Sequence, residues 1–308
     1  MLKRTLVISS PHHLSVRNRQ LVLSNKDTGE QNQAPMEDLN CLLLDQQGIT
    51  ITQAAISELT LNNVAVIFCD EKHLPASMLL PLESHHLPNL RLRQQLDASE
   101  PLRKQLWQQT VKAKLRNQAA LLEILGKNGE PLRRWASRVR SGDTGNAEGV
   151  ASRYYWRNLF GDEFKRDRYG GPPNHLLNYG YAILRASAAR SLVGSGLLPA
   201  LGIHHHNQYN AFCLADDIME PFRPFVDQAV WKRVQRGIDV EITREDKIEL
   251  LNVLSADVVF GEEKSILSIA LGTVSANLAK CFEGTEKNLI YPSLRGSSQK
   301  NPVGQNLG

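Results

Sequence analysis

The hydrophobic period of this chain changes near residue 100, and that change constrains the fold more than any other feature. Before residue 80, apolar residues form short β-prone runs or alternate with polar residues, as strands require. These segments are 5–9, 20–24, 41–44, 49–52 and 64–69. From residue 101 onward, apolar residues recur at helical spacing. The pattern predicts an α+β protein in which a small β-rich domain precedes a large all-helical domain.

The pattern divides the first 100 residues into a domain and a linker. Residues 1–80 are predicted to form the β-rich domain, in which residues 53–62 form one short covering helix. The polar segment 27–38 is expected to be a long hairpin loop. Residues 81–100 are predicted to be a linker, because closely spaced prolines interrupt regular structure there.

The remaining two segments are the helical domain and a tail. Residues 101–285 are predicted to form the helical domain, and residues 286–308, which are rich in serine, glycine and proline, a disordered tail. Besides one helix that begins near residue 101, the spacing predicts helices over 148–160, 174–193, 212–236, 244–260 and 265–283.

Several large protein classes do not fit this sequence. The four cysteines lie at long, irregular intervals without a C-x-x-C pair, which argues against a zinc finger or a disulfide framework. The apolar run at residues 6–8 is too short for a signal peptide, and no stretch approaches the roughly 18 apolar residues of a membrane span. We therefore expect a soluble cytoplasmic protein with reduced thiols and no membrane partner.

Charge is distributed unevenly along the helical domain. Residues 101–170 hold 15 Lys and Arg against 7 Asp and Glu, whereas residues 201–270 hold 7 basic and 12 acidic residues. A basic half beside an acidic half suits an enzyme that binds phosphates and holds a divalent metal ion. Solvent-exposed helix faces explain the same distribution equally well.

The densest group of candidate metal ligands lies within residues 202–224. The histidines at 204–206 are consecutive, so in an extended segment only one or two of them can face one ion. Glu220 follows Asp216 by four residues and Asp217 by three, which places either pair on one helix face, where like charges repel. Two carboxylates and one imidazole favour Mg²⁺ or Mn²⁺ over structural zinc. Solvated carboxylates and a surface loop of histidines are the simpler alternative.

Glu148 is the second candidate. It lies in the first turn of a predicted helix, where a carboxylate stabilises the positive end of the helix, so a structural role explains it locally. In the functional interpretation it is a third metal ligand that folding brings to His205 and Glu220. The basic and aromatic residues of 153–168 can bind phosphates and stack on bases, although such aromatics more often belong to the core.

Common catalytic motifs are absent, including the phosphate-binding loop, the dinucleotide fingerprint, H-E-x-x-H and G-x-S-x-G. Instead, an ordered series of motifs covers nearly the whole chain. The motifs are residues 106–118, Glu148 with Tyr154-Tyr155-Trp156, residues 172–181, Gly202-x-x-His205 and Asp217-x-x-Glu220-Pro221-Phe222-Arg223-Pro224. Together they resemble one family, the CRISPR-associated adaptation integrases that insert new spacers. The histidine segment and the length are most similar to the variety found in type II systems.

The resemblance implies which residues hold a metal. In this family one Glu, one His and one further acid coordinate a divalent ion, and the matching residues here are Glu148, His205 and Glu220, with Mg²⁺ or Mn²⁺ as cofactor. Many relatives have Asp at the position of Glu220, whose longer side chain should still reach the ion. Asp217 matches another recurrent acid, which would assist the metal or orient His205.

The resemblance also implies a reaction and partners. A 3′-hydroxyl of a short DNA duplex would attack a phosphodiester of the repeat array, with no nucleotide triphosphate and no covalent protein intermediate. The N-terminal domain, implied to be β-sandwich-like, would mediate a homodimer. Two dimers would flank a dimer of a small ferredoxin-like adaptation protein, joined in type II systems by further adaptation proteins. The basic segment 101–170 would bind the double-stranded DNA of prespacer and repeat array.

Two other functions are compatible with the sequence. A general metal-dependent nuclease would hydrolyse DNA or RNA without joining it. A non-catalytic DNA-binding scaffold would need no metal. Joined products longer than the substrate distinguish an integrase from a nuclease, and the presence of Glu148, His205 and Glu220 argues against a scaffold.

Overall fold

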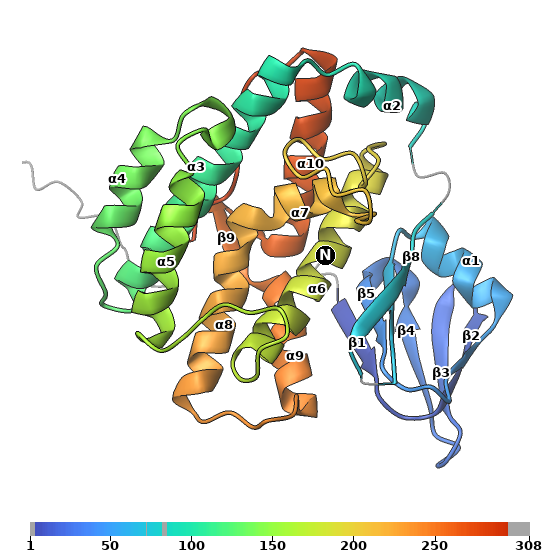
Figure 1. The fold of residues 1–308 in the computed structure, drawn as a ribbon. Coiled ribbons are helices and arrows are strands. Elements are labelled where there is room, and N and C mark those ends of the chain that lie inside the picture. The colour runs from blue at the N-terminus through green and yellow to red at the C-terminus, as the bar shows by residue number, and fades with distance from the viewer. Residues whose placement is uncertain (1–3, 72, 82–84, 295–308) are drawn as a thin grey trace, which may run out of the picture.

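The structure, a computed structural model, describes residues 4–71, 73–81 and 85–294 (Figure 1). A β-rich N-terminal domain, blue in Figure 1, lies beside a larger helical domain coloured from green to red. The predicted α+β organisation is therefore confirmed. No helix within the described ranges is both long and apolar enough to cross a membrane.

The N-terminal domain contains two four-stranded sheets that share one core. In the first sheet, three parallel strands and one antiparallel edge strand have the order β1 (Arg4–Ile8), β5 (Leu39–Leu44), β7 (Ala65–Cys69) and β8 (Pro75–Leu79). The second has the order β4 (Gln31–Pro35), β3 (Gln20–Asn25), β2 (His12–Arg17) and β6 (Thr50–Ile51). The predicted helix is α1 (Gln53–Leu61), and its Ala55 and Leu59 pack in the shared core. This is the sandwich-like arrangement that the resemblance implies.

β5 connects the cores of the two domains because both of its faces are buried. Successive side chains of a strand point to opposite faces. Leu42 and Leu44 lie in the core shared by the two sheets, whereas Cys41 and Leu43 lie in the core of the helical domain. A strand that is covered on both sides needs a continuous apolar run, which is the pattern of residues 41–44.

The helical domain is built around the long helix α3 and the central helix α6 (Figure 1). Its helices are α2 (Pro88–Leu96), α3 (Glu100–Ile124), α4 (Glu130–Arg138), α5 (Ala147–Phe160), α6 (Asn174–Gly194), α7 (Cys213–Met219), α8 (Arg223–Gln235), α9 (Arg244–Asn252) and α10 (Leu267–Glu283). A two-stranded hairpin, β9 (Asp257–Phe260) and β10 (Glu263–Ile266), precedes α10.

The predicted helix over 212–236 is interrupted. α7 ends at Met219, a 3-10 turn follows over Glu220–Phe222, and α8 begins at Arg223. Pro221 and Pro224 lie in the first turns of these two elements. Because proline has no backbone N–H, the chain begins new helical turns here instead of continuing α7. The interruption places Glu220 at a corner between two helices.

The predicted helix over 244–260 is also shorter than expected. α9 ends at Asn252, and Asp257–Phe260 form β9, which pairs antiparallel with β10. Two adjacent β-branched residues in this strand, Val258 and Val259, favour the extended conformation.

The predicted linker contains a helix that belongs to the helical domain. α2 begins at Pro88, and proline is well tolerated in the first turn of a helix. The buried side-chain amide of Gln95 donates to the carbonyls of Leu198 and Leu201 and accepts from the N–H of Leu198. These three hydrogen bonds attach α2 to the loop that leads into the histidine segment.

The predicted tail begins later than residue 286. The side chain of Asn117 donates to the carbonyl of Pro292 and accepts from the N–H of Leu294, and Leu294 itself is buried. The hydroxyl of Tyr291 lies 2.9 Å from that of Thr110. Residues up to 294 are therefore part of the helical domain, and residues 295–308 lie outside the described residues.

The polar segments at residues 12–17 and 31–35 carry a weak strand signal, yet both pair with β3. The predicted hairpin loop over 27–38 thus contains β4 and a 3-10 turn, Met36–Asp38. Mostly polar segments can form these strands, because the backbone hydrogen bonds that join them to β3 do not depend on the side chains.

Candidate active site

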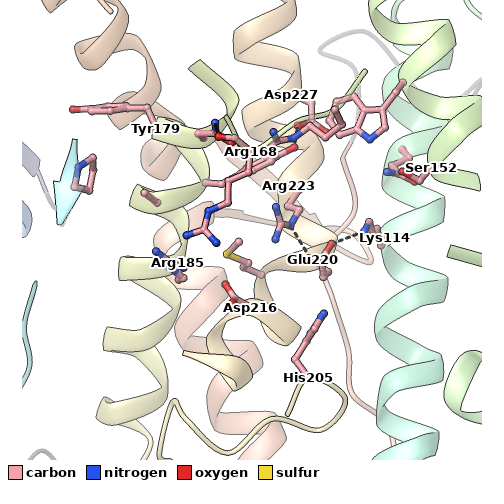
Figure 2. A pocket seen from close by; sticks show the side chains of 18 of the residues that line it. Lys114, Ser152, Arg168, Tyr179, Arg185, His205, Asp216, Glu220, Arg223 and Asp227 are labelled. Atoms are coloured by element: carbon pink, nitrogen blue, oxygen red, sulfur yellow. Dashed lines mark hydrogen bonds and ion pairs between the residues drawn. The ribbon is translucent and has the colours of Figure 1, made fainter. Parts of the chain in front are cut away.

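A cavity of about 720 Å³ opens between α3, α5, α6 and the segment that joins α7 to α8 (Figure 2). Five cationic side chains line it, together with the carboxylates of Asp216, Glu220 and Asp227. The cationic residues are Lys114, Arg166, Arg168, Arg185 and Arg223. The guanidinium groups of Arg166 and Arg223 both lie over the ring of Tyr181, at 5.3 and 4.4 Å from its centroid. Such a cavity provides charge and aromatic surface for a phosphate-bearing ligand.

The basic and aromatic residues near Glu148 divide into two groups. Trp156 lines the cavity, whereas the hydroxyl of Tyr154 donates to a backbone carbonyl and that of Tyr155 donates to the buried Asp227. Arg157 pairs with Asp162 at the surface. Only part of this predicted phosphate-binding segment therefore faces the cavity.

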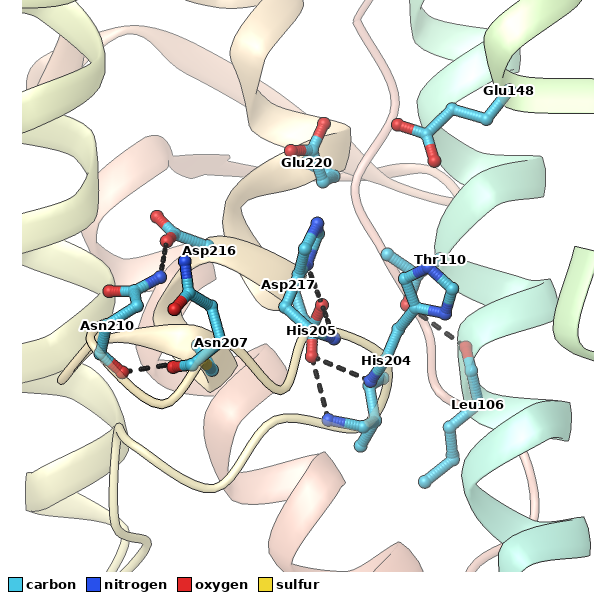
Figure 3. A network of polar contacts seen from close by, with 12 residues as sticks. Leu106, Thr110, Glu148, His204, His205, Asn207, Asn210, Asp216, Asp217 and Glu220 are labelled. Atoms are coloured by element: carbon cyan, nitrogen blue, oxygen red, sulfur yellow. Dashed lines mark hydrogen bonds and ion pairs between the residues drawn. The ribbon is translucent and has the colours of Figure 1, made fainter. Parts of the chain in front are cut away.

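Glu148 reaches the site from the first turn of α5. The carboxylate of Asp143 accepts the N–H groups of Ala147 and Glu148, and the side chain of Asn146 accepts that of Gly149. Because these two residues cap the helix, the Glu148 carboxylate is not needed for capping. Figure 3 shows it pointing toward Glu220 across the space above His205.

His205 is held by a buried aspartate. Its Nδ1 lies 2.6 Å from Oδ1 of Asp217, a side chain with no exposed surface. The Asp217 carboxylate also accepts the N–H groups of Ile203, His204 and His205. This hydrogen bond raises the pKa of His205 and orients the ring, so that the other ring nitrogen faces Glu220 (Figure 3).

Gly202 is required for this arrangement. A Cβ atom at residue 202 would lie 2.3 Å from the carbonyl oxygen of His205 and 2.8 Å from Oδ2 of Asp217. Real Cβ atoms do not approach backbone oxygens this closely, so a side chain here would open the loop. The Gly202-x-x-His205 spacing therefore has a direct structural reason.

The three consecutive histidines point in different directions, as the sequence predicts. The ring of His204 stacks on Trp107 with a centroid distance of 4.1 Å and an angle of 1°. Burial lowers the pKa of His204. His206 is exposed. Only His205 both contacts Asp217 and lines the large cavity.

Glu220 is the most deeply buried of the three predicted ligands, and it has two cationic neighbours (Figure 2). Nε of Arg223 lies 2.8 Å from its Oε1, and Nζ of Lys114 lies 2.5 Å from its Oε2. Burial would raise the pKa of Glu220, but Arg223 and Lys114 outweigh it and hold the pKa well below its usual value. Glu220 is therefore an anion in this cleft.

Lys114 connects two of the predicted ligands and was not predicted as a site residue. Its Nζ lies 2.5 Å from Oε1 of Glu148 as well as 2.5 Å from Oε2 of Glu220. Burial lowers the pKa of Lys114, but the two carboxylates outweigh that effect and keep it above its usual value. An ammonium ion thus lies between Glu148 and Glu220.

The donor set fits a divalent metal ion. Oε2 of Glu220 is buried, and its contact is the Lys114 ammonium group at 2.5 Å. Carboxylates are typical ligands of Mg²⁺ and Mn²⁺, and the free nitrogen of an imidazole whose other nitrogen is held by a carboxylate can add a third ligand. Within the described residues no three acidic, histidine or cysteine side chains already stand at metal-ligand separation. Lys114 occupies the intervening position.

Asp216 does not join this group. Its Oδ2 accepts from the side-chain amide of Asn210, and it lines the cavity next to Met219. Asp217, three residues before Glu220, orients His205 instead of facing the cavity. Of the two acid pairs considered in the sequence, therefore, neither provides two ligands from one helix face.

Fold and site together define a two-domain protein whose cleft presents carboxylates, an imidazole and arginines. The chain belongs to the family described as CRISPR associated protein Cas1, which matches residues 6–247. It is 39% identical over 298 residues to the CRISPR-associated endonuclease Cas1 of Neisseria meningitidis serogroup C (strain 8013), covering 96% of this chain and 97% of that protein. The family resemblance is confirmed, and the chain is a CRISPR adaptation protein of the endonuclease and integrase class.

One more distant relative has the same description, and two solved structures share the fold. A CRISPR-associated endonuclease Cas1 of Francisella tularensis subsp. novicida (strain U112) is 26% identical over 255 residues, which cover 75% of this chain and 79% of that protein. Among solved structures, a casposase bound to its integration product has a TM-score of 0.77 at 20% identity and covers 94% of this chain and 93% of its own. A CAS1 protein from Thermotoga maritima has a TM-score of 0.74 at 18% identity and covers 96% and 100%. These two structures support the fold alone.

Proposed function

We propose that this protein is the metal-dependent integrase of CRISPR adaptation, which inserts short duplex DNA into the repeat array. The observation that supports this function best is the approach of Glu148, His205 and Glu220, from three separate elements, to one side of an arginine-lined cavity. Family membership supplies the biological context. A cavity lined by arginines beside two carboxylates and an imidazole is suited to phosphodiester chemistry.

In this proposal Glu148, His205 and Glu220 hold Mg²⁺ or Mn²⁺, which when bound polarises the scissile phosphate and stabilises charge in the transition state. Asp217 keeps the His205 ring in position through its Nδ1. Arg166, Arg168, Arg185 and Arg223 neutralise the DNA backbone in the cavity.

The reaction conserves the number of phosphodiester bonds. The 3′-oxygen of the incoming strand forms a new bond to a phosphorus atom of the repeat, and the bond from that phosphorus to the target's own 3′-oxygen breaks. The attacking hydroxyl loses its proton, and the departing oxygen takes one up to become a new 3′-hydroxyl. Because one phosphodiester replaces another, no nucleotide triphosphate is required.

The partners belong to the same proposal. The β-rich domain, residues 1–80, mediates a homodimer, and a small ferredoxin-like adaptation protein bridges two such dimers. One structural neighbour was solved as a Cas6-RT-Cas1–Cas2 complex, with a TM-score of 0.71 at 22% identity, covering 94% of this chain and 36% of its own. Assignment to the type II variety, with its further adaptation proteins and a prokaryotic cytoplasmic location, stays a prediction.

Strand transfer tests the proposal directly. Labelled short duplex DNA and a supercoiled plasmid with a repeat are incubated with the protein, its small partner, and Mg²⁺, Mn²⁺ or EDTA. We expect the label to appear in the plasmid only with metal, and to be lost with Glu148→Ala and Glu220→Ala. Transfer that persists in EDTA would contradict the metal site.

The same experiment separates the alternatives. Metal-dependent cleavage without joined products would identify a general nuclease. Binding of DNA without cleavage or joining would identify a scaffold. The arginine-lined cavity is compatible with all three, so only the products decide.

A further inference from the structure

We propose that Lys114 is a resident counter-ion of the cleft, whose ammonium group holds the place between Glu148 and Glu220 until a divalent cation displaces it. The inference rests on the proposed function, because it concerns the same metal site. Its basis is that Nζ of Lys114 lies 2.5 Å from Oε1 of Glu148 and 2.5 Å from Oε2 of Glu220. One cation thus lies where two predicted metal ligands meet.

Burial makes a cation at this point necessary. The Lys114 side chain is 11% exposed and that of Glu220 is 7% exposed, so neither charge is well solvated by water. Two glutamates directed at one another without a cation would repel across a medium that screens charge poorly. Arg223 compensates Glu220 on its other oxygen, Oε1, and forms no ion pair with Glu148 within the described part of the chain. Lys114 alone joins the two carboxylates.

The contacts of Lys114 with the two glutamates would also allow a metal ion to replace its ammonium group. Lys114 donates a hydrogen bond to Glu148 and forms an ion pair with Oε2 of Glu220. A carboxylate oxygen has more than one lone pair, so Glu220 can also be a ligand of a metal ion. Lys114 lines the large cavity and stands on a flexible four-carbon stem, so its ammonium group has space to leave the carboxylates while α3 stays in place.

Replacing the Lys114 ammonium group by a divalent cation would change the charge of the cleft. Glu148 and Glu220 balance Lys114 and Arg223 in the metal-free state, so these four side chains are neutral together. A divalent cation adds two positive charges and releases an ammonium group toward a cavity already lined by arginines. With the metal ion bound, these four side chains and the ion would carry a net positive charge that suits a DNA phosphate, whereas without it the four side chains are neutral together.

Metal binding to the Lys114→Met variant tests the inference. Methionine keeps the length and the apolar stem but removes the charge. A Mn²⁺ titration followed by electron paramagnetic resonance, which reports free Mn²⁺, should show binding on the order of 10-fold tighter than in the parent protein, a coupling of ordinary size. In EDTA the variant should unfold at a lower temperature than the parent, and it should gain more stability from Mn²⁺.

Three further variants make the test specific. Lys112→Met removes one charge from the same helix, at a residue outside the cavity lining, and should retain the parent's Mn²⁺ affinity. Lys114→Arg keeps the charge and should also retain it. Lys114→Gln is a neutral, hydrogen-bonding replacement and should bind Mn²⁺ more tightly, even where Lys114→Met fails to fold.

The outcomes distinguish this inference from the proposed function. Parent and Lys114→Gln proteins that bind Mn²⁺ equally, through a site lost in His205→Ala, would overturn the inference and leave the metal site standing. Tighter binding by the neutral variants supports the inference even where strand transfer is absent. No binding by any variant would overturn the metal site and the inference together.

Discussion

Two buried lysines of this protein make nearly the same contact in different settings. At the junction of the two domains, Nζ of Lys247 lies 2.5 Å from Oδ2 of Asp45, and the side chains are 9% and 3% exposed. In the cleft, Nζ of Lys114 lies at the same distance from Glu148 and Glu220. The junction pairs one lysine with one carboxylate, whereas the cleft places two carboxylates around one lysine beside an open cavity.

The difference shows that a buried ion pair does not reveal its role by distance or burial. Asp45 is also 3.0 Å from Nδ1 of His73, so the junction aspartate is surrounded by donors from its own domain and from α9. In the cleft, Oε2 of Glu220 contacts the Lys114 ammonium group at 2.5 Å and keeps a further lone pair. A fully satisfied pair stabilises the folded protein as it is, whereas a pair with unused ligand capacity can accept a metal.

The largest expected effect is on the stability of the junction. Lys247→Met leaves the Asp45 carboxylate buried next to a neutral side chain, and breaking a buried pair in this way costs about 3–5 kcal/mol of unfolding free energy. Urea denaturation measures the loss, and Mn²⁺ should not restore it. The double variant Lys247→Met/Asp45→Leu should recover a large part. A loss below about 1 kcal/mol would mean that the two lysines differ less than we argue.

The next effect is on catalysis in the cleft. His205→Ala should reduce strand transfer on the order of 10²–10³-fold, the typical cost of removing one group that stabilises charge in a transition state. The His205 side chain is 45% exposed, so its removal should change stability little. His206→Ala, an exposed neighbour on the same loop, is the matched control. An equal loss in both variants would attribute the effect to the loop.

Asp227 extends the comparison of the two buried lysine sites, because it is a buried carboxylate whose hydrogen-bond donors are tyrosines and not a lysine. Asp227 accepts hydrogen bonds from Tyr155 and Tyr181, and burial raises its pKa to about 6. The folded protein therefore holds this proton at pH values where the unfolded chain has lost it. The stability from Asp227 is complete below pH of about 4 and is lost as the pH rises through about 6, a change on the order of 3 kcal/mol.

Asp227→Asn should flatten this part of the pH dependence. Urea denaturation between pH 4 and pH 7 measures it, with the parent protein losing stability relative to the variant as the pH rises. If the unfolding free energies of parent and variant instead change with pH in parallel, Asp227 has an ordinary pKa, and the two tyrosine hydroxyls compensate for its burial.

The smallest of these effects concerns the residue that positions His205. Asp217→Asn keeps the size of the side chain but weakens the hydrogen bond to Nδ1, and outer partners of metal ligands typically change affinity or activity 10–100-fold. We expect weaker Mn²⁺ binding and slower transfer by this factor. Parent-like Mn²⁺ affinity with reduced thermal stability would assign Asp217 to the loop alone.

Much of this protein could be predicted from its residues. The α+β order and the helix starting near residue 148 depend on local periodicity and were confirmed. The proline-rich segment 81–100 and the serine-rich end of the chain misled the prediction, because α2 and residues 287–294 are attached by long-range contacts, among them the side-chain hydrogen bonds of Gln95 and Asn117. Such long-range hydrogen bonds leave no periodic signal.

Lys114 had a signal that sequence reasoning passed over. It lies four residues after Thr110 and four before Gln118, and all three are buried on one face of α3. A lysine on the buried stripe of a helix requires a carboxylate partner, because an unpaired ammonium is costly to bury. The pattern predicts that a partner exists, but not which of the 32 Asp and Glu residues it is.

The sequence by itself determined the order of the two domains and the motifs that point to Glu148, His205 and Glu220. These depend on neighbouring residues, whose backbone preferences and spacing act within one or two turns. Only the tertiary structure decided that Asp217 orients His205 and that Asp216 accepts a hydrogen bond from Asn210 outside the group of predicted ligands. It also decided that Lys114 lies between the two glutamates. The contact of Lys114 with Glu148 spans 34 residues and that of Asp217 with His205 spans 12, so both depend on how distant segments pack, and charge alone does not specify its partner.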